Sequence, residues 1–144
     1  MRRYVIEKSA QSSADPSEVY RLLRDGATWP DWSSIKGFEL EREGDGEPEG
    51  VGAVRVFLNG RIRGRDEITG FAPDRQFRYN HLDGLPVRDY RGVVDIVPRD
   101  SGADITWTVS FGPKYFGTGW VLNRMLGRFL QQCVDGLAEH AAAA

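Results

Sequence analysis

The most chemically varied stretch of the sequence is HLDGLPVRDYRG, residues 81 to 92, which holds one histidine, two aspartates, two arginines and one tyrosine. Histidine and aspartate side chains can exchange protons, and a tyrosine hydroxyl can donate a hydrogen bond to a carbonyl. Acid–base catalysis requires such groups to converge on one point, whereas successive side chains of a strand point to opposite faces. The function of this stretch therefore depends on which of its residues share a face.

No signature of covalent, phosphate or metal chemistry accompanies this stretch. The sequence has no nucleophilic Ser or Cys motif, no glycine-rich phosphate loop and no paired-carboxylate motif. Its one cysteine, Cys133, lies in an apolar segment and is expected to be buried. Two histidines, His81 and His140, are too few for a histidine-based metal site. We therefore expect neither a metal nor a cofactor.

Length and charge exclude several classes of protein. The 144 residues predict one domain over residues 1–140, followed by a frayed alanine tail over residues 141–144. With 19 Lys+Arg against 21 Asp+Glu, the net charge of -2 argues against a nucleic-acid binder. No apolar run approaches the ~20 residues of a membrane span, and the N-terminus does not resemble a signal peptide. We expect a cytoplasmic protein without an integral membrane segment, as a monomer or weak homodimer.

Two hydrophobic periods predict the elements that position the polar groups. Residues 3–11 predict a strand, and DPSEVYRLLRDG predicts a short helix with Asp15 and Glu18 in a capping box. A further helical turn carries Trp29 and Trp32, and residues 118–141 predict a long helix with one apolar face, capped by Thr118. A period of two between these helices predicts an antiparallel meander of six strands. These strands are expected at residues 37–43, 51–58, 61–70, 75–82, 87–97 and 103–112.

The order of these elements resembles a known superfamily. The segments SADPSEVYRLLRDGATWPDW, GAVRVFLNGRIRGRDEI, GLPVRDYRGVV and ADITWTVSFGPKYFGTGW together resemble START/Bet v1-like (SRPBCC) proteins, and most closely the polyketide cyclase/dehydrase and lipid-transport-like branch. The resemblance implies an α+β helix-grip fold, in which a seven-stranded curved antiparallel sheet wraps around the long C-terminal helix and two short helices follow the first strand. It also implies an internal cavity for an apolar small molecule.

The turn at residues 59 and 60 determines one proposed strand register. If Asn59 and Gly60 form a two-residue turn, Leu58 faces Arg61 across the hairpin. The opposite face of the sheet then holds the apolar residues Val54, Val56 and Leu58 beside arginines 61, 63 and 65. Either arginine stems cover these apolar residues, or the register slips by one residue. The expected register places Arg55, Phe57, Ile62, Gly64, Asp66 and Ile68 on the cavity face, and a slip would place Arg65 and Glu67 there.

The hairpin that contains the opening stretch divides its polar residues between two faces. A four-residue loop, Asp83–Pro86, would pair Tyr79 with Tyr90 and His81 with Arg88. These four residues then face the cavity, and the stretch is interpreted as a hairpin at the rim of a pocket. The solvent face is expected to carry Arg78, Asn80, Asp89, Arg91 and Asp95.

The proposed registers predict the lining of the cavity. The last hairpin would pair Val94 with Trp107, which continues the same apolar face. A diagonal contact would bring Arg55 close to Asp66, either as a structural ion pair or as a polar anchor for a ligand. Arginines 61, 63 and 65 share a sheet face that is either solvated or binds an anionic lipid or acidic partner. The expected lining is Trp32, Arg55, Phe57, Asp66, Tyr79, His81, Arg88, Tyr90, Trp107, Phe111, Met125 and Phe129.

Three functions follow from this interpretation. The first is a carrier of a hydrophobic small molecule, such as a lipid, polyketide or isoprenoid-like compound. The second is a cyclase or aromatase in which Asp66, His81, Tyr79 or Tyr90 moves protons while the cavity folds a poly-carbonyl chain. The third is an interaction protein, such as a quinone-binding chaperone that docks on a larger complex.

Overall fold

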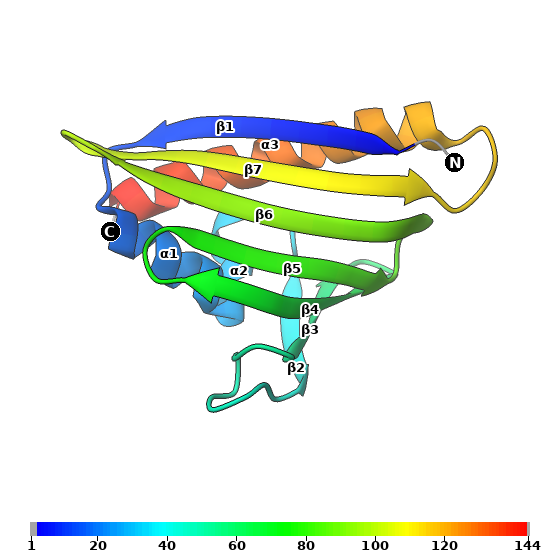
Figure 1. Ribbon diagram of the computed structural model, residues 1–144, viewed down its shortest axis with the longest axis horizontal. Helices are drawn as coiled ribbons and strands as arrows, with labels where there is room; N and C mark the ends of the chain where they lie inside the picture. The colour runs from blue at the N-terminus through cyan, green and yellow to red at the C-terminus, as the bar shows by residue number, and fades with distance from the viewer. Residues whose placement is uncertain (1–2, 144) are drawn as a thin grey trace.

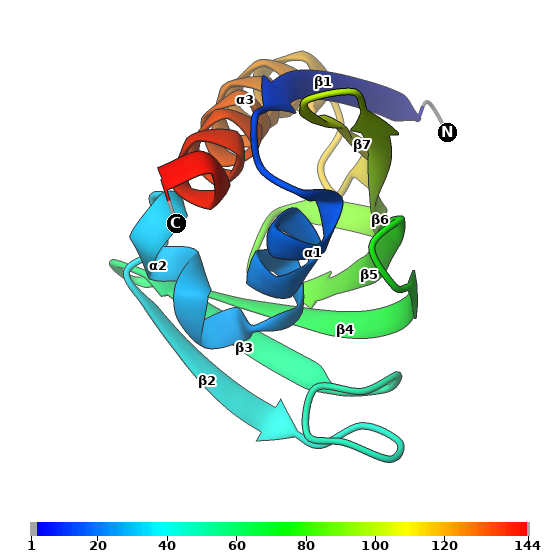
Figure 2. The ribbon, with the colours of Figure 1, turned by 90° about the vertical axis from the view of Figure 1, so that its left-hand side faces the viewer.

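One seven-stranded antiparallel sheet organises the computed structural model, which describes residues 3–143. The strand order is β1-β7-β6-β5-β4-β3-β2. The sheet curves around the helices, and α3 packs against β1 and β7 (Figures 1 and 2). The predicted helix-grip fold is confirmed. The elements are β1 (Tyr4–Ser12), α1 (Pro16–Arg24), the 3₁₀ helix η1 (Gly26–Thr28), α2 (Trp29–Trp32), β2 (Gly37–Arg42), β3 (Val54–Asn59), β4 (Ile62–Ala72), β5 (Gln76–Asp83), β6 (Val87–Arg99), β7 (Gly102–Pro113) and α3 (Gly119–Ala143).

The ends of the helices differ in detail from the prediction. Asp15 caps α1 by accepting a hydrogen bond from the Ser17 amide, but the Glu18 carboxylate binds Arg21 and does not complete a capping box. Thr118 holds the predicted cap position directly before α3, where its carbonyl accepts a hydrogen bond from the Leu122 amide at 3.1 Å, while its hydroxyl donates to the Tyr115 carbonyl.

Helix α3 is longer and more firmly packed than expected. Its buried side includes Cys133, and burial raises the pKa of this thiol to about 12. Helix α2 approaches so closely at Gly136 that an added Cβ would lie 1.9 Å from the Trp32 carbonyl oxygen. The helix continues to Ala143, and Ala141 is buried. Residues 141–143 are therefore part of a packed helix and not a frayed tail.

Two hairpin registers differ from the proposed ones by two residues. Asn59 pairs with Ile62, so the turn residues are Gly60, at φ +63°, and Arg61. His81 likewise pairs with Tyr90, and not with Arg88. Because side chains alternate with a period of two, a shift of two does not by itself change the face on which a residue lies. The slip by one residue that would have turned Arg65 inward does not occur.

Ion pairs cover the convex face of β3 and β4. Val54 and Val56 are buried although they lie on that face. Arg63 binds Glu39 at 3.0 Å, and Arg65 binds both Glu41 at 2.7 Å and Asp83 at 2.8 Å. Arg65 lies directly opposite Val56, and Val54 lies between Glu67 and Arg42 on the neighbouring strands, so ion-paired side chains flank both valines.

Candidate ligand-binding cavity

A cavity of about 220 Å³ lies between the concave face of the sheet and α3. Most of its lining is aromatic or aliphatic, and the polar side chains are Asn59, Asp66, His81 and two tyrosines. Two lining residues are also exposed to solvent, Ile62 at 48% and Met125 at 62%, and they mark the mouth of the cavity. The full lining is Trp29, Ile35, Phe57, Asn59, Ile62, Gly64, Asp66, Tyr79, His81, Leu85, Tyr90, Trp107, Met125, Leu126 and Phe129.

Asp66 and His81 form a hydrogen-bonded pair in the cavity wall. They lie on neighbouring strands as direct partners, and His81 Nδ1 is 2.8 Å from Asp66 Oδ1. The Leu85 backbone amide donates to His81 Nε2 at 3.2 Å. An amide can only donate, so Nε2 is the unprotonated ring nitrogen and Nδ1 carries the proton that binds Asp66. Both ring nitrogens are therefore engaged, and His81 orients Asp66 and the β5–β6 loop.

Tyr79, Tyr90 and Trp107 form a second polar group in the cavity. Trp107 Nε1 donates to the Tyr79 hydroxyl at 3.0 Å, and the hydroxyl of Tyr90 is close enough to that of Tyr79 to influence its pKa. The tyrosine rings lie 6.3 Å apart, so the expected contact exists, although the strand partner of Tyr79 is Gly92. Burial raises the pKa of both tyrosines, which therefore serve as neutral hydroxyl groups and not as bases.

The buried tyrosines predict a loss of stability in alkali. The folded state holds the phenol protons of Tyr79 and Tyr90 more tightly than the unfolded chain does, because folding raises both pKa values. Their contribution to stability is complete below the unfolded pKa of about 10 and is lost as the pH rises above it, by about 1.4 kcal/mol per pH unit for each tyrosine. Urea denaturation at increasing pH measures this slope. Tyr90→Phe should remove the contribution of Tyr90 to the decrease of the unfolding free energy with pH. An unchanged decrease in this variant would contradict the prediction.

Arg55 does not pair with Asp66, although the two are direct strand partners. Its Nη1 donates to the Leu23 carbonyl at 3.0 Å and to Glu49 Oε1 at 3.2 Å. The guanidinium also lies among three aromatic rings, at 5.0 Å from the ring centre of Trp29. Burial lowers the pKa of Arg55, and the Glu49 carboxylate opposes this shift. The expected Arg55–Asp66 ion pair is wrong. Arg55 binds the carboxylate of Glu49, in the β2–β3 loop, and Asp66 binds His81.

Four residues of the expected lining lie elsewhere. Trp32 packs where α2 meets α3, Phe111 is buried beside Tyr4, and Arg55 lies behind Trp29 and Phe57. Arg88 is exposed because a bulge between Arg88 and Arg91 interrupts the alternation of β6. The remaining eight line the cavity as expected: Phe57, Asp66, Tyr79, His81, Tyr90, Trp107, Met125 and Phe129.

The residues that sequence reasoning missed lie mainly outside the sheet alternation. Trp29 and Ile35 come from α2 and the segment after it, and Leu85 comes from the β5–β6 loop. Ile62 lies on the expected cavity face but outside the expected lining, and so does Gly64. The position of Gly64 leaves open space: an added Cβ would meet only the His81 ring, at 3.5 Å, and the Phe57 carbonyl, at 3.8 Å.

Residues 3–143 show neither a metal-binding cluster nor a membrane-spanning helix. These residues contain no group of three or more side chains arranged to hold a metal ion. None of the helices in this range is long and apolar enough to cross a membrane.

Solved structures share this fold at low sequence identity. A protein from Thermobifida fusca is 22% identical, with a TM-score of 0.79, over 96% of this chain and 93% of that chain. A START superfamily protein from Mycobacterium smegmatis is 16% identical, with a TM-score of 0.80, over 96% and 97%. Norcoclaurine synthase from Thalictrum flavum, solved in complex with dopamine and hydroxybenzaldehyde, is 13% identical, with a TM-score of 0.74, over 99% and 88%.

Sequence comparison identifies the family directly. No curated protein sequence matches the chain. The family model described as polyketide cyclase/dehydrase and lipid transport matches residues 3–142. That match spans every strand and nearly all of α3. The chain therefore belongs to the polyketide cyclase/dehydrase and lipid transport family.

Proposed function

We propose that the protein binds a compact hydrophobic molecule, such as an isoprenoid-like compound, a polyketide or a small lipid, in the cavity between the sheet and α3. The observation that carries this proposal is an aromatic-lined cavity with a few polar groups on one wall. Pockets of this kind bind ligands through apolar contact and use a small number of polar groups for orientation. The family, whose description includes lipid transport, supports the same reading.

The size of the cavity favours a compact ligand. Its volume of about 220 Å³ is below the ~300–1,000 Å³ of pockets for drug-sized molecules. A ring system of one to three rings therefore suits it better than a long acyl chain. The exposed and flexible side chain of Met125 lies at the mouth, where its movement admits part of a longer ligand.

Asp66 gives the cavity a defined polar side. His81 occupies Oδ1 of this carboxylate and fixes its orientation. A ligand hydroxyl that donates to Asp66 would form a charge-assisted hydrogen bond in a site from which water is largely excluded. The proposed ligand thus has an apolar body and at least one hydrogen-bond donor.

Matched probes test both parts of this proposal. Native mass spectrometry of freshly purified protein should show a bound small molecule, and titration should show binding of naphthalene and tighter binding of naphthol. The naphthol hydroxyl should improve affinity about tenfold through Asp66, and Asp66→Asn should remove most of that difference. Equal affinity for the two probes in the unmodified protein would contradict the polar role of Asp66. Failure of both probes to bind would contradict the cavity as a binding site.

A second candidate function is cyclisation of a poly-carbonyl chain in the same cavity. The oriented Asp66 carboxylate favours it, since this group could accept a proton from an activated carbon. The neutral hydroxyls of Tyr79 and Tyr90 could then donate hydrogen bonds to the enolate oxygen. His81 would act only by positioning Asp66. Cyclisation that continues unchanged in Asp66→Asn would exclude this assignment.

A further inference from the structure

An exposed apolar surface lies at the start of α3 and in the loop that precedes it. Phe116 is fully exposed, Trp120 is 67% exposed and Tyr115 is 58% exposed. Large apolar side chains that gather at one surface usually mark an interaction site. We define the aromatic-basic surface as Lys114, Tyr115, Phe116, Trp120, Val121, Arg124, Met125 and Arg128, all of which are exposed.

The charge of this surface is positive. No Asp or Glu occurs between Asp104 and Asp135, although the whole chain has a net charge of -2. None of the ion pairs formed among residues 3–143 involves Lys114, Arg124 or Arg128. The arginines of the convex sheet face, in contrast, bind carboxylates. The cations of the aromatic-basic surface are therefore available to an anionic partner.

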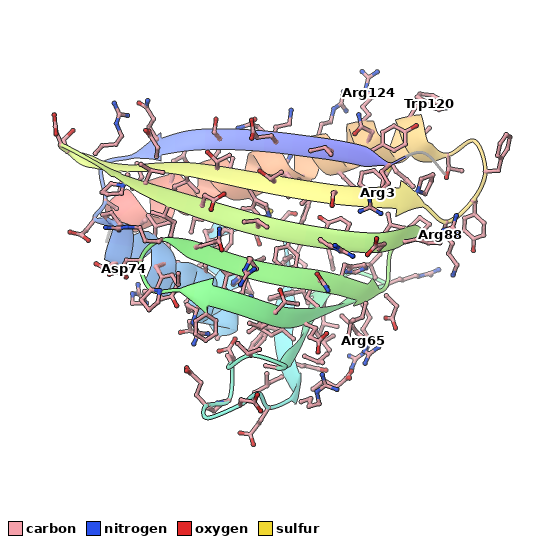
Figure 3. The ribbon with its side chains drawn as sticks, in the orientation of Figure 1. Arg3, Arg65, Asp74, Arg88, Trp120 and Arg124 are labelled. Atoms are coloured by element: carbon pink, nitrogen blue, oxygen red, sulfur yellow. The ribbon has the colours of Figure 1, made fainter. Side chains whose placement is uncertain are left out.

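Helical spacing arranges the two kinds of side chain in adjacent stripes. Trp120, Arg124 and Arg128 are four residues apart and lie along one side of α3. Figure 3 shows Trp120 and Arg124 projecting from the first turns of α3, next to the β7–α3 loop. Val121 and Met125 form the neighbouring stripe, and Met125 also lines the cavity. The surface thus borders the cavity mouth.

We propose that the aromatic-basic surface docks the protein on an anionic lipid bilayer, with Phe116 and Trp120 in the interface and the cavity mouth close to the lipid. Aromatic rings favour the boundary between headgroups and acyl chains, and basic residues attract anionic headgroups. A second copy of this chain is a less suitable partner. An isologous dimer through this surface would bring the arginines of both copies together.

The docking surface can be tested with vesicles and with the intrinsic fluorescence of Trp120. Trp29, Trp32 and Trp107 are buried, so quenching by brominated phosphatidylcholine reports on Trp120 alone. The protein should co-sediment with mixed vesicles of phosphatidylcholine and phosphatidylglycerol and show this quenching. It should bind vesicles of pure phosphatidylcholine at least about tenfold more weakly than the mixed vesicles. Raising the salt concentration should weaken binding to the anionic vesicles.

Surface variants separate the contributions of apolar and charged residues. Phe116→Ser and the double charge reversal Arg124→Glu with Arg128→Glu should each weaken binding by about tenfold or more. Val97→Ser is the matched control, because Val97 is 56% exposed and lies in β6 near the β6–β7 hairpin, at the opposite end of the molecule (Figure 1). Absence of binding to anionic vesicles would overturn the proposal. Concentration-dependent dimerisation that Phe116→Ser abolishes, without vesicle binding, would assign the surface to a second copy instead.

Discussion

Replacing Gly64 by phenylalanine is expected to weaken ligand binding about a hundredfold or more and to leave the fold intact. Gly64 lies in β4 with its Cα facing the cavity, and the atoms closest to an added Cβ are at ordinary contact distances. A phenyl ring there would occupy the volume that the proposed ligand fills. Phenylalanine also suits a strand better than glycine does, so thermal stability should be retained or increased.

A fluorescence titration with phenylnaphthylamine, an uncharged aromatic dye, measures this effect. Gly64→Phe should weaken dye binding by about a hundredfold or more, the equivalent of ~3 kcal/mol, with an unchanged or higher Tm. Gly64→Ala is the matched control, because one methyl group leaves most of the cavity free. Undiminished dye binding in a folded Gly64→Phe variant would contradict the assignment of the cavity. The same variant should still bind anionic vesicles, which separates a failure of the cavity proposal from a failure of the docking proposal.

Glu49→Ala is expected to cause the largest loss of stability among surface-loop substitutions. Glu49 Oε1 accepts hydrogen bonds from the Gly26 amide and from Arg55, whose side chain is 1% exposed. Removing the carboxylate leaves a buried guanidinium without its counter-charge. Since Glu49 itself is 20% exposed, water compensates in part, and we expect a loss of about 2–4 kcal/mol in the free energy of unfolding.

Glu47 provides a matched control in the same loop. It binds Arg24 at 2.7 Å, but its side chain is 54% exposed, so Glu47→Ala should cost less than about 1 kcal/mol. Urea denaturation measures both variants. Adding Arg55→Met to Glu49→Ala should recover part of the lost stability, because the buried charge is then absent. Equal effects of Glu47→Ala and Glu49→Ala would refute the role assigned to the buried pair.

The cavity face of the sheet could be predicted from the sequence although two hairpin registers were wrong. A register error of two residues does not change which face a side chain points to. Both misjudged hairpins shifted by two residues, so Phe57, Asp66, Tyr79 and His81 remained on the cavity face. In the last hairpin, Val94 lies opposite Trp107 as predicted. Periodicity thus identified the face of the sheet without identifying the register.

The polar partners could not be predicted, because they depend on loops and on one bulge. Glu49 lies in the β2–β3 loop, which has no period that would place it against Arg55. Leu85 reaches His81 through its backbone, and no side-chain pattern records such a contact. Asp89 adopts a positive φ of +50° within the bulge that turns Arg88 outward. A non-glycine residue in that conformation has no reliable sequence signal.

Close contacts hold both halves of α3. In the C-terminal half, Trp32 approaches Gly136 closely and Ser12 donates a 2.7 Å hydrogen bond to the Ala138 carbonyl. In the first half, an added Cβ at Gly119 would lie 2.4 Å from the Tyr4 ring, and Leu122 and Leu126 are buried. Only the outward side of this half, with Trp120, Val121 and Met125, is exposed. The unbranched side chain of Met125 is therefore the adaptable part of the cavity mouth, on a helix whose backbone is held along its length.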